Sequence, residues 1–186
     1  MTRVLRQVPS DVLPYLGAVV LLTAALALLD LRRGRPAAEA WGLAVVDGAL
    51  VAAAVLIVLV TLSSRGAGRS VDLRPFQELW PVLRDPGGAA EGAWWVGANV
   101  LLFVPLGLLL PLRARALDGW ARILLAGAAV SAAVEILQFG LGMGRTAAVD
   151  DVLTNTAGAG LGYALLVTGR AALSRRARGE RHRPSG

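Results

Sequence analysis

The sequence predicts an all-α fold, a polytopic transmembrane helical bundle with about five spans. Hydrophobic residues make up 55% of the 186 residues and charged residues 17%, whereas about 25% of the residues of a typical soluble domain are charged. Crossing a bilayer takes about 20 mostly apolar residues. Stretches that meet this requirement lie at residues 12–31, 43–62, 94–112, 120–139 and 152–170.

Composition excludes several kinds of chemistry. The chain has no cysteine and a single histidine, His182, which lies in a charged tail. Disulfides, thiolate metal sites and histidine-based catalytic triads are therefore ruled out, and we expect no metal and no cofactor. All 19 basic residues are arginines, and many flank apolar stretches. This placement points to the lipid bilayer as partner, with anionic headgroups preferred over nucleic acid.

The first two stretches form a predicted pair of N-terminal helices within residues 1–62. A signal peptide is an alternative for the first stretch, because residues 38–40 resemble a cleavage site. The apolar run is long for a signal peptide, and Arg32, Arg33 and Arg35 follow it. These arginines favour a membrane span that stops translocation.

Arginine placement predicts the orientation of the spans. Seven arginines fall on the side of the N-terminus and twelve on the side of the C-terminus. Basic residues favour the cytoplasm, so we predict a multi-pass protein of the bacterial plasma membrane with its N-terminus outside and its C-terminus inside. Trp41 and Trp120 mark the inner boundary, and Trp80, Trp94 and Trp95 the outer one.

The remaining segments are polar. Residues 63–92 form an outer loop, and its middle part, VDLRPFQELWPVL, reads as a short helix in the membrane interface. Residues 93–170 hold the last three spans, which form the predicted core. Residues 171–186 are rich in arginine and are predicted to be a disordered basic tail.

A small set of polar residues interrupts the apolar core. The predicted topology brings all of them to one level, near the outer surface; Asn99, for example, lies about 7 Å inside its span. Polar groups in a membrane usually face one another or a wet cavity. We therefore predict an outward-facing, ligand-binding polar pocket. Its candidate residues are Asn99, Glu135, Gln138, Arg145, Asp150, Asp151 and Asn155.

Helical spacing supports this convergence. Gly127, Ser131, Glu135 and Gln138 fall on one stripe of their helix. Asp151, Asn155, Gly158 and Gly162 fall on one stripe of the last span, where the two glycines allow another backbone to approach closely. Contacts such as Glu135–Arg145 and Asn99–Asn155 could serve only to lock helices together, and this structural interpretation remains open beside the pocket.

The same residues resemble a known family. The pattern Asn99-x-x-x-Phe103-x-Pro105-x-Gly107, followed by Glu135-x-x-Gln138, Arg145, Asp150-Asp151 and Asn155-x-x-Gly158, is similar to the VanZ-like family. Upstream, Leu73-x-Pro75-Phe76 resembles its N-L-x-P-F signature, with Asp72 in place of asparagine. The resemblance covers residues 72–168. It implies a small bacterial membrane protein of the type associated with resistance to the glycopeptide teicoplanin, and it brings no established reaction.

Three functions remain open at this stage. The first is a pocket that binds an amphipathic envelope ligand, either a lipid-linked wall precursor or a glycopeptide. The second is an intramembrane enzyme acting on a lipid-linked glycan or phosphate, with Glu135 or Asp151 as general base and a divalent cation on Asp150 and Asp151. The third is a purely structural membrane assembly partner. The sequence carries no signal for ligand identity or oligomeric state.

Overall fold

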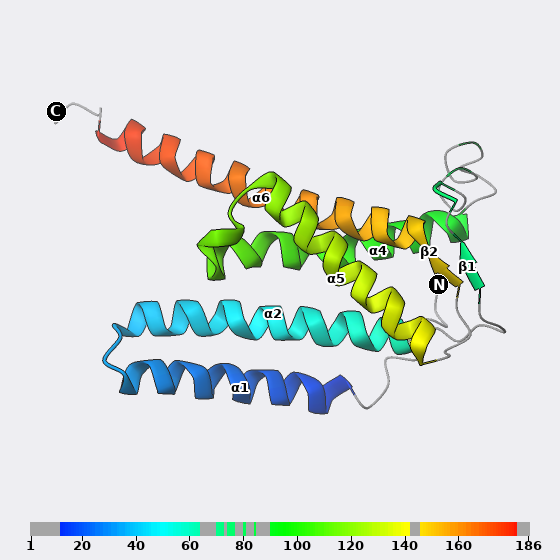
Figure 1. Ribbon diagram of the computed structural model, residues 1–186. Helices are drawn as coiled ribbons and strands as arrows, with labels where there is room; N and C mark the ends of the chain where they lie inside the picture. Colours follow the sequence, from blue (N-terminus) through cyan, green and yellow to red (C-terminus); the bar gives the residue numbers. More distant parts are fainter. Residues whose placement is uncertain are drawn as a thin grey trace. The chain divides into compact units, whose positions relative to one another are not determined.

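The computed structural model describes residues 12–63, 70–72, 74–76, 80, 84, 90–141 and 146–181. These residues are almost entirely helical, which confirms the predicted fold class (Figure 1). The chain divides into two compact units, residues 1–56 and 57–186. Each unit is described by itself.

The first unit is a helical hairpin. Helix α1 (Val12–Arg32) is followed by a short turn and by most of α2 (Ala37–Ser63). Gly34 permits the turn because its φ is +81°, a value that side chains disfavour. Asp30 forms ion pairs with Arg33 at 3.5 Å and with Arg35 at 3.2 Å, so the arginines after α1 neutralise the acid near its end.

The second unit contains three long helices. They are α4 (Ala90–Arg113), α5 (Trp120–Gly140) and α6 (Val149–Arg181), and a short 3₁₀ helix, η2 (Arg115–Leu117), joins the first two. The last turns of α2, from Ile57 onward, also belong to this unit.

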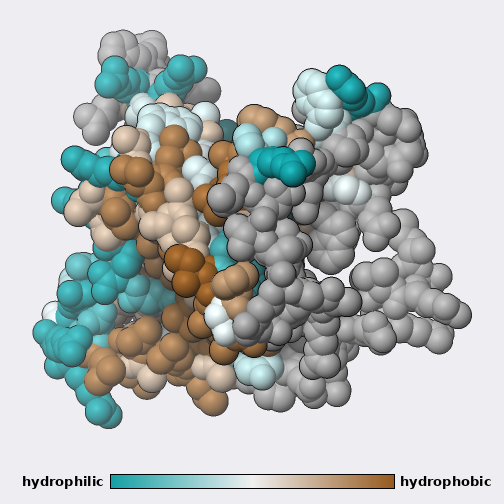
Figure 2. Space-filling model, turned by 45° about the vertical axis from the view of Figure 1, so that its right-hand side comes forward, coloured by the Kyte–Doolittle hydropathy of each residue, from teal (hydrophilic) through white to brown (hydrophobic). Residues whose placement is uncertain are grey.

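Three helices among the described residues are long and apolar enough to cross a membrane. They are α2 over Ala37–Val60, α4 over Gly92–Arg113 and α5 over Trp120–Gly140. Large apolar side chains on α4 and α5 face outward, with Leu101 69% and Ile136 73% exposed. Hydrophobic residues cover much of the visible described surface (Figure 2). The spans at 12–31 and 152–170 are present as helices, and their crossing of the membrane stays a prediction.

Glycines let α4 and α6 pack backbone against backbone. A Cβ added to Gly158 would lie 2.1 Å from the carbonyl oxygen of Val100, and one added to Gly162 would lie 2.0 Å from that of Val104. From the other side, a Cβ added to Gly107 on α4 would lie 1.8 Å from the carbonyl oxygen of Ala159 on α6. The predicted close approach at Gly158 and Gly162 is confirmed, and its partner is α4.

Two short strands lie near the start of α6. Strand β1 (Ser70–Asp72) pairs in parallel with β2 (Thr146–Ala148), with Val71 opposite Ala147. The prediction contained no strand here. The pairing ties the loop after α2 to the residue directly before α6. Val71 and Asp72, the first residues of the predicted interfacial helix, lie in β1 instead, and most of the remaining segment is outside the described residues.

The basic tail is more ordered than predicted. Helix α6 continues past Arg170 to Arg181, so the prediction of disorder is wrong for residues 171–181. Alanine, leucine and arginine dominate this stretch, and all three are strong helix formers. The preceding turns of α6 supply the helix nucleus that an isolated tail would lack.

A polar clamp joins α6 to Asp118, which lies between η2 and α5. The Tyr163 hydroxyl donates to Asp118 Oδ1 at 2.9 Å, and Arg170 Nη1 donates to Asp118 Oδ2 at 2.8 Å. Trp120 packs edge-to-face on Tyr163 with 5.0 Å between ring centroids. The hydrogen bond from Tyr163, and then the one from Arg170, hold the pKa of Asp118 below its ordinary value.

The first prediction concerns the glycine contact. Gly158→Ala places a methyl group against the Val100 carbonyl, so α4 and α6 must separate. We expect it to lower protein stability by about 1–3 kcal/mol, the usual effect of overpacking. The measurement is thermal unfolding in detergent. Gly169→Ala on the same helix is the control, because its Cβ would meet no atom within 4 Å. Equal melting temperatures would contradict the packing described.

The second prediction concerns the dependence of protein stability on pH. Because the pKa of Asp118 is lowered in the folded protein, the clamp contributes stability above the unfolded pKa of about 3.9 and loses it as pH falls below that value. Between pH 6 and pH 3, we expect the melting temperature of wild type to fall more than that of Asp118→Asn. Melting curves measured at steps of about one pH unit resolve the difference. Parallel curves for the two proteins would show that the clamp contributes nothing.

Candidate functional site

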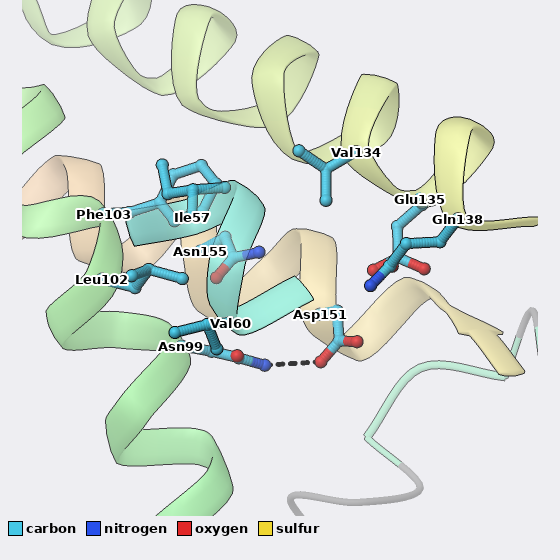
Figure 3. Close-up of a pocket in the computed structure, with 10 residues that line it drawn as sticks. All are labelled: Ile57, Val60, Asn99, Leu102, Phe103, Val134, Glu135, Gln138, Asp151 and Asn155. Carbon is cyan, nitrogen blue, oxygen red and sulfur yellow. Dashed lines mark hydrogen bonds between the residues drawn. The ribbon is translucent and has the colours of Figure 1, made fainter. Parts of the chain in front are cut away.

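Polar side chains from three helices converge on one cavity (Figure 3). Asn99 comes from α4, Glu135 and Gln138 from α5, and Asp151 and Asn155 from α6. The described lining is completed by apolar residues, including two from the last turns of α2. These apolar residues are Ile57, Val60, Leu102, Phe103 and Val134.

Helix α5 contributes through one buried stripe. Gly127, Ser131, Glu135 and Gln138 are all buried, while Ile136 and Leu137 between them are exposed. This is the stripe that the sequence predicted. Glu135 is only 9% exposed, so its carboxyl group lies in the protein interior. This placement avoids the cost of exposing an ionisable side chain to lipid.

Helix α6 supplies two buried polar side chains one turn apart. Asp151 accepts a hydrogen bond from Asn99 Nδ2, which ties α6 to α4. Asn155 donates from Nδ2 to Ser131 Oγ at 2.8 Å, which ties α6 to α5. Asp151 also lies in the first turn of α6, where the partial positive charge of the helix N-terminus stabilises a carboxylate.

An acceptor of Asn155 in the cavity is unsatisfied. Asn155 is 6% exposed, and its Oδ1 has no hydrogen-bond partner among the described residues. A buried amide oxygen without a partner costs about 1–3 kcal/mol, so such atoms usually meet water or a ligand. The cavity has a volume of about 20 Å³, which is enough for one water molecule. A water-sized polar group therefore fits beside Asn155.

Asp150 turns away from this cavity. Although buried, it does not line the pocket, and its Oδ1 accepts a hydrogen bond from the backbone nitrogen of Phe76. Phe76 has a φ of +69°, so this bond holds a turn that a non-glycine residue rarely adopts. Asp150 thus positions the loop after β1. Its neighbour Asp151 bonds to a different segment, α4, through Asn99.

Of the seven predicted site residues, five line the cavity. Asp150 lies next to it on α6 with the role just given, and Arg145 is outside the described residues. Ser131 was not predicted as a site residue, although its place one turn before Glu135 on the predicted stripe could have indicated it. Among the described residues, no group of three or more His, Cys, Asp or Glu is placed to hold a metal ion.

The third prediction tests the link between α5 and α6. Ser131→Ala removes the acceptor of the buried Asn155 amide, so we expect a loss of stability of about 1–3 kcal/mol. Ser174→Ala is the matched control, because that hydroxyl is exposed and bonds only to its own helix. Thermal unfolding in detergent measures both. A Ser131 variant as stable as the control would mean that the bond is dispensable.

One comparison with known protein families agrees with the fold and the site. A scan against protein-family models matches residues 49–170 to VanZ/LLP1. The match begins within α2, earlier than residue 72, where the sequence resemblance began, and it includes the part of α2 that lines the cavity. Searches of curated proteins and of solved structures gave no match. Since the family model covers well over half of the 186 residues, the chain belongs to the VanZ/LLP1 family.

Proposed function

We propose that this VanZ-family membrane protein binds an amphipathic molecule of the bacterial cell envelope, with one polar group of that molecule in the cavity. The observation that carries the proposal is the unsatisfied Oδ1 of Asn155 inside a water-sized cavity lined by polar side chains of three helices. A group that donates a hydrogen bond, such as a hydroxyl or an ammonium, would satisfy this oxygen.

The lining supports an amphipathic ligand. Half of the lining residues are polar and half are apolar, and the apolar ones include Val60, which is exposed at 36%. A cavity of about 20 Å³ admits one hydroxyl-sized group but no sugar ring. The polar group would enter while the apolar part stays beside α2 and α4 in lipid. Both ligands named from the sequence, a lipid-linked wall precursor and a glycopeptide, are amphipathic.

The predicted orientation belongs to the same proposal. With the N-terminus outside, the cavity faces the outer leaflet of the plasma membrane, where wall precursors and glycopeptides meet. Arg145 would then pair with an anionic group of the ligand near the start of α6. A contribution to teicoplanin resistance follows only if the glycopeptide is the ligand.

The fourth prediction tests binding. We expect Asn155→Leu, which keeps the size of the side chain but removes its amide, to weaken binding of a labelled lipid-linked wall precursor or of teicoplanin about tenfold, the effect of one buried hydrogen bond. Glu135→Gln should also weaken it. Binding is measured on purified protein in lipid nanodiscs. The control is Glu39→Gln, at an exposed position of α2.

The outcomes separate the three functions. Unchanged binding in variants that remain folded would reject the proposal. Unfolding of the variants, with no binding by wild type to either probe, would favour a structural assembly role, for which the bonds between the helices already provide a basis. Conversion of the wall precursor to a new species, abolished by Asp151→Asn, would favour the enzyme.

A further inference from the structure

A second polar surface lies at the opposite end of α4 from the cavity. There α4 ends at Arg113, η2 begins at Arg115, and α5 carries Arg122 in its first turn. All three side chains are exposed. Arg113 follows Asn99 by fourteen residues, which corresponds to about 21 Å along a helix, so this surface is distinct from the pocket.

The positive charge of this turn exceeds what its single acid neutralises. Asp118 is the only acid between Arg113 and Arg122. Its two carboxylate oxygens are engaged by Tyr163 and Arg170, both from α6. Arg115 and Arg122 make no ion pair in the part of the chain that the structure describes. Two exposed guanidinium groups of the same turn therefore remain available to an anion.

The surface continues into an apolar stripe. Arg122, Leu125 and Ala129 follow one another at helical spacing on α5, all exposed, with Leu125 70% exposed. Beside them Trp120 is 52% exposed, although its ring is held against Tyr163. Tryptophan at the end of an apolar helix is typical of the membrane–water interface. Charge at the interface and apolar residues below it follow the order of headgroup and acyl chain in a phospholipid.

We propose that the turn between α4 and α5 is a binding site for an anionic phospholipid. The phosphate group binds to the guanidinium groups of Arg115 and Arg122, and an acyl chain lies along Leu125. The clamp of Asp118, Tyr163 and Arg170 holds the turn in place. By the predicted orientation this lipid belongs to the cytoplasmic leaflet.

The site is specific in a way that general attraction to a charged membrane is not. Arg175 and Arg176, farther along α6, are also exposed and carry the same charge. The exposed side chains next to them in sequence are those of Leu173 and Arg178. A lipid held only by net charge would respond equally to the loss of either arginine pair, whereas a built site responds to one.

The fifth prediction uses this contrast. The whole protein is purified in detergent with phosphatidylglycerol, and bound lipid is counted by native mass spectrometry, with phosphatidylcholine as the neutral comparison. We expect Arg115→Gln/Arg122→Gln to weaken retention of phosphatidylglycerol about tenfold to thirtyfold, the effect of two interfacial charges. Arg175→Gln/Arg176→Gln, with the same change of charge, should retain it nearly as wild type does.

The remaining arms make the result decisive. Arg115→Lys/Arg122→Lys keeps the charge and should retain more lipid than the glutamine pair, which separates binding from misfolding. Equal losses in the two glutamine pairs, or equal retention of phosphatidylcholine, would overturn the proposal. Displacement of the lipid by inorganic phosphate at millimolar concentration would assign the arginines to a free anion, and would overturn it as well.

Discussion

The close approach of the α4 and α6 backbones is the contact on which the rest of the second unit depends. Lipid is as apolar as leucine, so helices in a membrane gain little from burying apolar side chains and associate through close packing and hydrogen bonds. Gly107, Gly158 and Gly162 remove the side chains that would hold the two backbones apart. Only at that separation can Asn99 on α4 reach Asp151 on α6.

This packing places polar groups where their burial has to be compensated. Asn99 with Asp151 and Ser131 with Asn155 form two bonds that each join α6 to another helix. Both bonds satisfy donors of amide groups, and the carbonyl oxygen of Asn155 is left over. This oxygen is the group on which the proposed binding of a hydrogen-bond donor rests.

Much of this arrangement could be predicted because helix geometry makes local sequence informative. The spacing of Ser131, Glu135 and Gln138 fixed their common face, and the pair Gly158 and Gly162 indicated a close neighbour. The identity of that neighbour was not predictable, because nothing local says which helix meets the glycines. The contact of Gly107 with Ala159 was equally unpredictable, because it depends on the register between two helices distant in sequence.

The two consecutive acids show where sequence reasoning reached its limit. Asp150 and Asp151 have the same side chain, and both begin α6, so composition and depth assigned them one role. Successive residues on a helix point about 100° apart, which sends one carboxylate toward Asn99 and the other toward the backbone of Phe76. That loop reaches Asp150 because β1 pairs with β2, and strands of three residues leave no periodic signal. The two acids thus bond to different segments of the chain, Asp151 to α4 and Asp150 to the loop after β1.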